Sequence, residues 1–161
     1  MARAETTDFM QNNRFHVVEQ GNFLDPVAGF QTATLPELSV EEIEYKEGID
    51  SFTRKYPGNP EFDTITLEKG VVRNGTDFFD WVIKSALGGE YRTDLAIWTF
   101  HRSDPKGISD GAPSRIYRLY EAFAVRVKPA GDLDATSADV SLAELDIAFE
   151  SFDIELSNRN A

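Results

Sequence analysis

The chain has 161 residues and a mass of 18.1 kDa, a length that fits one domain with its own hydrophobic core. Its formal net charge of −12 disfavours general nucleic-acid binding, and its lack of cysteine excludes disulfides, thiolate metal sites and a cysteine nucleophile. With 41% hydrophobic residues and no apolar run near the roughly 20 residues of a membrane helix, it should be an acidic, folded globular domain.

The first half of the chain predicts strands around one long irregular segment. Residues 1–12 are polar and are expected to form a mobile arm. Alternating or β-branched composition predicts four strands, at residues 13–19, 29–35, 39–45 and 62–72. Residues 46–61 hold two glycines and two prolines among charged side chains, which predicts a long loop or a protruding hairpin.

One helix is predicted in the middle of the chain, over residues 77–87. Thr76 or Asp77 can cap its start, and Gly88-Gly89 supplies the left-handed residue that commonly ends a helix. Apolar side chains then recur at three- and four-residue steps and predict one buried stripe: Phe79, Val82, Ile83, Ala86 and Leu87.

Three more strands are predicted after the helix, at residues 94–101, 115–128 and 139–156. Alternation places five apolar residues of the second of these strands on one face: Tyr117, Leu119, Phe123, Val125 and Val127. In the last strand the apolar phase slips near 143–144, which indicates a bulge, and again near 150–151. The elements together predict a mainly β domain with one helix laid over an open end or face.

No constellation of residues indicates catalysis or metal binding. His16 and His101 are far apart, and neither has a second histidine or a carboxylate at ligand spacing, so we interpret both as sheet-surface residues. Among 28 acidic residues some close carboxylate pair is inevitable, and therefore none is diagnostic of a glycosidase. The sequon Asn74-Gly75-Thr76 is interpreted as a chance match. We expect no enzyme, no cofactor and no metal.

The charges are unevenly distributed along the chain. Residues 37–50 carry six acids against Lys46 alone, and residues 129–158 carry eight acids and no Lys or Arg, whereas most basic residues lie between them. Runs of this kind are usually solvated faces. Complementary patches also suit a subunit that docks on another copy of itself, and long strands with exposed edges can be paired in an oligomer.

Four motifs in order resemble one known family. The motifs are I-E-Y-K-E-G (43–48), R-K-Y-P-G (54–58), I-T-L-E-K-G-V (65–71) and F-F-D-W-V (78–82). They resemble the tail tube proteins of contractile-tailed phages and related phage-like injection systems, and the likeness extends in outline over residues 14–156. The chain departs from the family pattern at residues 31–38, which lack a family glycine, and at residues 149–151.

The resemblance implies a fold and an assembly. Family members have two small antiparallel sheets that form a β-sandwich or barrel with a helix packed outside, and they assemble into hexameric rings with a continuous inner β-barrel. The resemblance then divides the chain into the arm 1–12, a tail-tube domain 13–157 with a protruding hairpin loop 46–61, and a short tail 158–161.

The resemblance also implies contact residues. The hairpin loop would reach a neighbouring subunit or ring, where its cations would meet acidic residues; the implied contacts are Lys46, Glu47, Arg54, Lys55, Tyr56, Pro57 and Gly58. The helix outside the barrel would be marked by Phe79, Asp80, Trp81 and Val82.

The implied function is structural. The protein would be a subunit of the inner tube of a contractile phage tail or injection system, assembled in the bacterial cytoplasm, without membrane integration. Its partners would be copies of itself, the sheath protein and baseplate or terminator proteins, with DNA or effector cargo sliding through an acidic lumen without specific binding. The alternatives are a tube-initiator or baseplate ring protein, or a monomeric β-sandwich module that binds carbohydrate or peptide through Trp98, Tyr117 and Tyr120.

Overall fold

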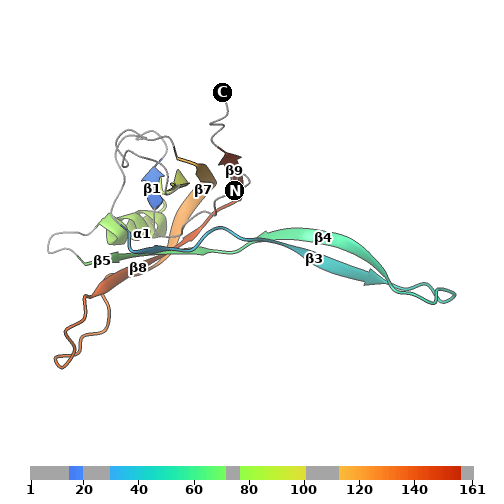
Figure 1. Ribbon diagram of the computed structural model, residues 1–161, viewed down its shortest axis with the longest axis horizontal. Coiled ribbons are helices and arrows are strands. Elements are labelled where there is room, and N and C mark those ends of the chain that lie inside the picture. Colours follow the sequence, from blue (N-terminus) through green and yellow to red (C-terminus); the bar gives the residue numbers. More distant parts are fainter. Residues whose placement is uncertain (1–14, 20–29, 72–76, 101–112, 157–161) are drawn as a thin grey trace, which may run out of the picture.

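The computed structural model describes residues 15–19, 30–71, 77–100 and 113–156, and shows a mainly β domain with one helix (Figure 1). Its strands are β1 (Phe15–Glu19), β2 (Thr32–Ala33), β3 (Leu38–Tyr45), β4 (Arg54–Phe62), β5 (Ile65–Gly70), β6 (Thr93–Thr99), β7 (Arg115–Lys128), β8 (Leu142–Ala148) and β9 (Ser151–Leu156). The helix is α1 (Asp77–Leu87), and every strand pairing is antiparallel. The predicted class is therefore confirmed. The arm 1–12, the tail 158–161, the sequon 74–76 and His101 lie outside the described residues.

The long strand β7 belongs to two four-stranded sheets. Its first half, residues 115–120, pairs with β6 on one edge and β9 on the other, and β1 extends β6, so the first sheet has the order β1-β6-β7-β9. Its second half, residues 123–128, pairs with β8, which is followed by β5 and β2, so the second sheet has the order β7-β8-β5-β2. Strands β1, β2 and β9 each have one edge without a partner strand among the described residues, so one chain by itself closes no barrel there.

Two bulges in β7 decide which of its side chains face the core. The register shifts between Thr93 and Leu95 of the β6 pairing and between Ala124 and Arg126 of the β8 pairing. Leu119, Ala122 and Ala124 are consequently buried. The predicted face of β7 is therefore wrong between the two bulges, where Val125 is 46% exposed, and right again at Val127, which packs against the core.

The first of these bulges has an unusual backbone. Glu121 has a φ of 52°, in the left-handed region that side-chain-bearing residues rarely adopt. Its N–H donates to Oδ1 of Asp94 over 2.9 Å, and the N–H of Glu150 donates to the carbonyl of Tyr120 over 3.1 Å. The bulge therefore lies where β7 passes from one sheet to the other and where β8 gives way to β9.

The predicted last strand is two strands in the structure. Residues 149–150 separate β8 from β9, which matches the second of the two predicted phase slips. The first slip, near residues 143–144, is not a bulge: β8 pairs with β5 in unbroken register, and Val140 precedes the strand with 75% of its surface exposed. The change in the apolar pattern arises because Val140 lies in the loop before β8 and not in the strand.

Strands β2 to β5 form one continuous antiparallel ribbon that leaves the body as a hairpin. Thr32 pairs with Glu68 in the body and Leu38 pairs with Phe62 at the base of the hairpin, in the same register. Of the two alternatives predicted for residues 46–61, the structure has the protruding hairpin: residues 54–61 belong to strand β4, and the connection between β3 and β4 is residues 46–53. The predicted strand 29–35 shrinks to the two residues of β2.

The core lies between the two sheets and is closed on one side by α1. Its fully buried side chains come from β1, β5, β6, β7 and β8: Val17, Ile65, Leu67, Ile97, Leu119, Leu145 and Ile147. Trp81 and Val82 of α1 pack against it. The predicted helix bounds are confirmed, and Gly88 ends the helix with a φ of 74°. The predicted stripe is only partly right, because Ile83 is 39% and Leu87 is 81% exposed.

Candidate assembly surface on the projecting hairpin

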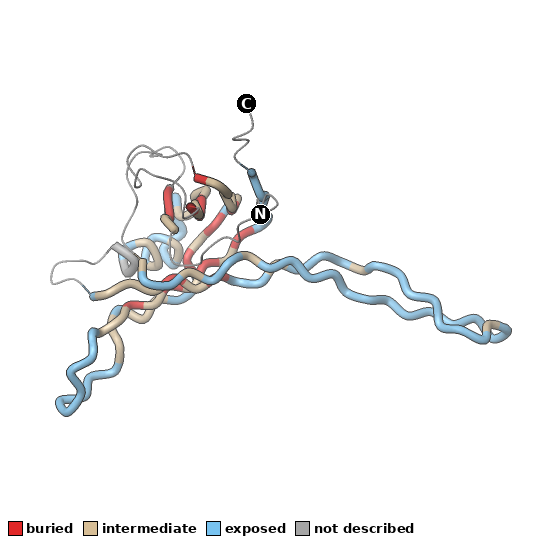
Figure 2. The backbone as a smooth tube through the Cα atoms, in the orientation of Figure 1, coloured by how far each residue is buried: buried red, intermediate tan, exposed pale blue. Residues whose placement is uncertain are grey.

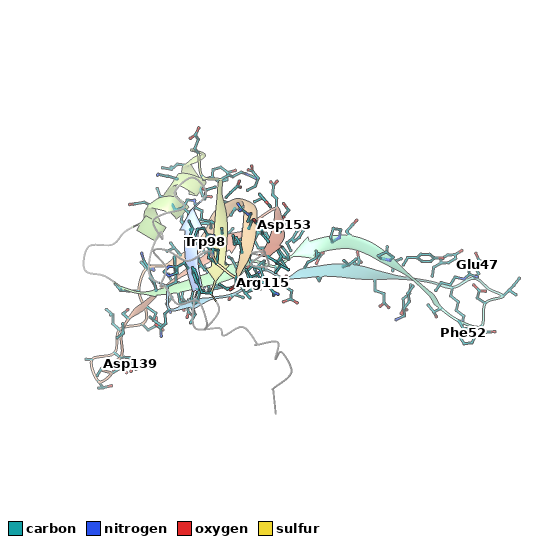
Figure 3. All side chains as sticks on the ribbon, turned by 45° about the horizontal axis from the view of Figure 1, so that its top comes forward. Glu47, Phe52, Trp98, Arg115, Asp139 and Asp153 are labelled. Atoms are coloured by element: carbon teal, nitrogen blue, oxygen red, sulfur yellow. The ribbon has the colours of Figure 1, made fainter. Side chains whose placement is uncertain are left out.

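The β3–β4 hairpin carries most of the contact residues that the sequence predicts, and it projects far from the body. Figure 1 shows it as the long arm of the molecule, and Figure 2 shows that almost all of it is exposed, whereas the buried residues gather in the body. All eight residues of β3 are exposed. Glu47 and Phe52 lie at its far end, remote from Trp98 and Asp153 of the body (Figure 3).

The base of the hairpin is anchored by three aromatic rings. Phe62, the last residue of β4, packs against the core. Its ring centroid lies 5.8 Å from that of Phe149 and 5.9 Å from that of Phe152, in tilted and edge-to-face arrangements that aromatic pairs favour. Because Phe149 and Phe152 flank the junction of β8 and β9, this cluster connects the hairpin to the region where the two sheets meet.

The charged residues of the hairpin have partners within it. Nε of Arg54 donates to Oδ2 of Asp50 over 3.0 Å. Nζ of Lys55 lies 2.5 Å from Glu42 and 3.6 Å from Glu44. These exposed pairs contribute little to stability in water. Both cations therefore already have acidic partners within the hairpin. The predicted contact of Arg54 and Lys55 with acids of another subunit stays a prediction.

A bulge divides the hairpin into a proximal and a distal half. Val40 pairs with Pro60 and Glu42 pairs with Pro57, so two residues of β4, at 58–59, face the single residue Glu41. A Cβ atom added to Gly58 would lie 3.0 Å from both Cβ and the carbonyl oxygen of Glu41. The close approach of the two backbones at this point therefore requires glycine.

The hairpin exposes large apolar side chains that nothing in the described chain covers. Seven such residues lie between 38 and 62, and each is about half exposed or more: Leu38, Val40, Ile43, Tyr45, Ile49, Phe52 and Tyr56. Ile49 and Phe52, in the terminal loop, are 99% and 83% exposed. Apolar surface of this extent on a soluble protein marks an interaction site.

The first sheet offers a second exposed surface at its edge. Phe152, Ile154 and Leu156 alternate along β9, opposite Leu119, Tyr117 and Arg115 of β7. Phe152 packs against the core, but Ile154 and Leu156 are 48% and 59% exposed. The edge strand β9 thus presents an open row of backbone groups flanked by uncovered apolar side chains, which is the arrangement that favours pairing with another chain.

The charges of the body, in contrast, are neutralised across its strands. Arg126 of β7 donates from Nε to Asp146 of β8 over 2.5 Å and from Nη2 to Glu144 over 3.0 Å, and the hydroxyl of Thr66 donates to Asp146 over 2.8 Å. The hydrogen bond from Arg126 lowers the pKa of Asp146 more than burial raises it, and the hydrogen bond from Thr66 lowers it further. Arg92 pairs with Glu150 and lies 3.7 Å from Glu121, so its guanidinium connects the bulge of β7 to the junction of β8 and β9.

The helix residues predicted to lie outside the barrel are placed as follows. Asp80 is exposed, while Trp81 donates from Nε1 to the carbonyl of Tyr91 over 2.8 Å and packs, with Val82, against the core. The side chain of Phe79 lies outside the described part of the structure. Helix α1 therefore covers the domain through Trp81 and Val82 and turns Asp80 to solvent.

Of the residues predicted for carbohydrate or peptide binding, Trp98 and Tyr117 are not brought together. Trp98 pairs with Ile116 across β6 and β7 whereas Tyr117 pairs with Ile97, so Trp98 and Tyr117 lie on opposite faces of the sheet. His16 meets Phe100 edge-on at 5.7 Å, and partial burial lowers its pKa. In the described ranges no three His, Asp or Glu side chains cluster as metal ligands, and no helix is long and apolar enough to cross a membrane.

The sequence prediction missed most of the apolar part of this surface. Of its seven exposed apolar residues only Tyr56 was predicted as a contact; Val40, Ile43 and Tyr45 were assigned to an ordinary strand, and Ile49 and Phe52 to the loop or hairpin 46–61. A signal was present, because Leu38 and Val40 alternate in one phase and Ile43 and Tyr45 in the other. No single buried face can accommodate both pairs on one regular strand.

One of the comparisons with known proteins identifies a family. The family model described as "T4-like virus tail tube protein gp19" matches residues 11–153. No curated protein matches the chain. Among solved structures, the anti-feeding prophage cap, a tube-terminating cap, has a TM-score of 0.79 and 19% identity, covering 96% of each chain.

Two structures of an extracellular contractile injection system are similar in fold as well. The PVC sheath–tube complex in the extended state has a TM-score of 0.78 and 23% identity over 94% of each chain. The PVC sheath/tube terminator has a TM-score of 0.76 and 22% identity over 93% of this chain and 99% of that chain. At these identities the structures show a common fold, and the family match shows that the chain belongs to the T4-like tail tube protein family.

Proposed function

We propose that this member of the tail tube family is a non-enzymatic structural subunit that forms hexameric rings, which stack into the inner tube of a contractile phage tail or phage-like injection system. The observation that carries the proposal is the hairpin: seven large apolar side chains, from Leu38 to Tyr56, stand exposed on an arm that reaches far from the body. A tube is built from many copies of one chain, and an arm of this kind gives each copy a surface to hold its neighbour.

The edges of the first sheet support closure of the ring. Its order β1-β6-β7-β9 is antiparallel throughout, so its outer strands β1 and β9 run in opposite directions. Strand β9 of one copy could therefore pair antiparallel with β1 of the next, and the two strands are similar in length, at six and five residues. Such pairing would continue the sheet around the ring as an inner β-barrel and would cover Ile154 and Leu156.

Further partners follow from the kind of particle. The similar solved structures are of a sheath–tube complex, a sheath/tube terminator, a tube-terminating cap and a baseplate. We infer that this protein meets a sheath protein along the outside of its tube and baseplate or terminator proteins at its ends, in a particle assembled in the bacterial cytoplasm. DNA or effector cargo would pass through the lumen without specific binding, because an acidic wall repels phosphate.

Assembly of the purified protein tests this proposal. Negative-stain microscopy should show six-fold rings and, at higher concentration, tubes of many stacked rings. A protein that stays monomeric by analytical ultracentrifugation at all concentrations would refute the structural assignment. Single rings that never stack on their own, but that join the end of a tube, would instead assign it to the tube-initiator or baseplate ring, the closest alternative role in the family.

A further inference from the structure

The apolar side chains of the hairpin do not share one face. Val40 pairs directly with Pro60, and Leu38 pairs with Phe62, so these four residues lie on one side of the ribbon. Ile43 pairs with Tyr56, and Tyr45 with Arg54. On β3 these two residues are an odd number of positions from Val40 and Leu38, so they lie on the opposite side. We call Leu38, Val40 and Pro60 the proximal patch, and Ile43, Tyr45 and Tyr56 the distal patch.

In each half of the hairpin, polar and charged residues occupy the face opposite the apolar patch. Beyond Val40, the face of the proximal patch continues with Glu42, Glu44 and Lys55, which form the ion cluster of the hairpin. On the other side, the face of the distal patch begins near the body with Ser39, Glu41 and Glu61. Each half of the hairpin therefore has one apolar and one polar side, and the apolar side changes at the bulge of Gly58.

The twist of the ribbon does not bring the two patches back to one side. Neighbouring strands are rotated by roughly 25° across a spacing of about 4.8 Å, which corresponds to a rotation of about 90° over five residues. Positions 39 and 44, the centres of the patches on β3, are five residues apart. A half-turn would be needed to align the patches, so they face directions about a quarter-turn apart and cannot lie on one flat surface.

The hairpin also needs support beyond its own strands. A two-stranded hairpin with neither face packed is marginally stable in water. Between Val40 and Tyr56, no residue of this hairpin is buried. Such an element needs a covering surface whenever the protein does its work, and in a tube of stacked rings every subunit has other copies of the chain as its neighbours.

We propose, on the basis of the proposed function, that two different copies of the chain hold the hairpin, one covering the proximal patch and the other covering the distal patch on the other face of the twisted ribbon. The hairpin then acts as a wedge between two copies, and the terminal residues Ile49 and Phe52 continue the distal contact. The Gly58 bulge is the point at which the hairpin passes from one copy to the other.

Site-specific crosslinking tests this directly, because the chain contains no cysteine. The variants Val40→Cys and Ile43→Cys each carry one benzophenone label on a unique thiol. Tubes are assembled from equal parts of ¹⁵N-labelled and unlabelled protein, irradiated and digested, so that mixed-isotope crosslinks identify contacts between copies. We expect residues 40 and 43 to crosslink to two different segments of neighbouring copies, and we expect a chain that carries both labels, diluted into excess unlabelled protein, to be joined to two further chains. Crosslinks of both residues to one common segment, products in which the doubly labelled chain is joined to a single further chain only, or crosslinks only within one copy would overturn the proposal.

A second measurement separates the two contacts energetically. Val40→Lys and Ile43→Lys each place a charge in one patch, and each should raise the critical concentration for assembly by about tenfold or more, since the charge would be buried without a partner. Ser39→Lys adds the same charge next to Val40 on the polar side and serves as the matched control. The double variant should multiply the two single effects, because the contacts are on separate copies.

The outcomes distinguish the two proposals. If the unmodified protein never assembles, the structural function fails and the wedge fails with it. If it assembles normally but the Ser39→Lys control blocks assembly as strongly as Val40→Lys, the patches have no separate sides and the wedge alone is refuted. Circular dichroism of each variant as a monomer keeps these results apart from misfolding.

Discussion

The strands of the body and those of the hairpin are stabilised in different ways. In the body, seven strands share a core in which Leu119, Leu145 and Ile147 are completely buried, and cations such as Arg126 are paired across strands. In the hairpin, β3 is exposed along its whole length and its apolar side chains face water on both sides. The core of the first region is complete within one chain, whereas the apolar surface of the second would be covered only by other molecules.

This difference separates folding from assembly along the chain. The body should fold in the monomer, because its burial does not depend on a partner. The hairpin buries little apolar surface in the monomer, so most of the stabilisation from burying its apolar side chains would come on assembly. Substitutions in the two regions should therefore act on different measurements, and the following predictions test that division from the largest effect to the smallest.

The largest contrast is between one buried and one exposed aliphatic residue. Leu145→Ala removes a fully buried side chain and should lower the free energy of unfolding of the monomer by about 2–5 kcal/mol. Ile43→Ala removes a half-exposed side chain of the hairpin and should change it by less than about 0.5 kcal/mol. Urea denaturation of the monomers measures both. Equal losses would mean that the hairpin is part of the folded core.

A smaller effect is expected at the junction of the two regions. Phe62→Ala removes the ring that contacts Phe149 and Phe152 and should cost about 2 kcal/mol, less than a fully buried ring, because Phe62 is only partly buried. Hydrogen exchange should also become faster in β3 and β4 while β6 stays protected. Phe62→Leu is the conservative control, and unchanged exchange in Phe62→Ala would show that the rings do not hold the hairpin.

The smallest effect concerns a charge of the body. The pKa of Asp146 is lowered in the folded protein by the hydrogen bond from Arg126, so this carboxylate stabilises the fold at pH above its ordinary pKa of about 3.9, and the contribution is lost as the pH falls through the folded value. Asp146→Asn should cost about 0.5–1 kcal/mol at pH 7 and should make stability less dependent on pH below about 4. Thermal melts from pH 7 to pH 3 measure this; an unchanged acid slope would contradict it.

Much of the fold follows from local patterns in the sequence. The helix 77–87 was predictable because capping residues, a helical apolar period and Gly88 agree, and β7 was predictable because its long alternation is bounded by turn residues. The face of β7 was not predictable. The bulge at Glu121 depends on Asp94, far away in sequence, which accepts its N–H. Nothing local to a Glu residue indicates a left-handed backbone.

The hairpin shows the limit of the same reasoning for the site. Residues 54–61 contain two prolines and a glycine, which normally exclude a central strand, so the composition could not decide between a long loop and a protruding hairpin. The segment is nevertheless β4, because a two-stranded ribbon leaves one backbone edge of each strand unpaired, where proline loses no hydrogen bond. The charged motif residues were found from resemblance, while the apolar patches became visible only once the strand register was known.

The number of strands in the first sheet has a consequence for stoichiometry. Because four is an even number, each added copy would repeat the same up-and-down order, and the pairing of β9 with β1 would be identical at every junction. Strand pairing alone therefore allows a ring of any number of copies. In such a ring the number of copies would be set by the angle at which β9 of one copy meets β1 of the next, and so by the twist of the four-stranded sheet.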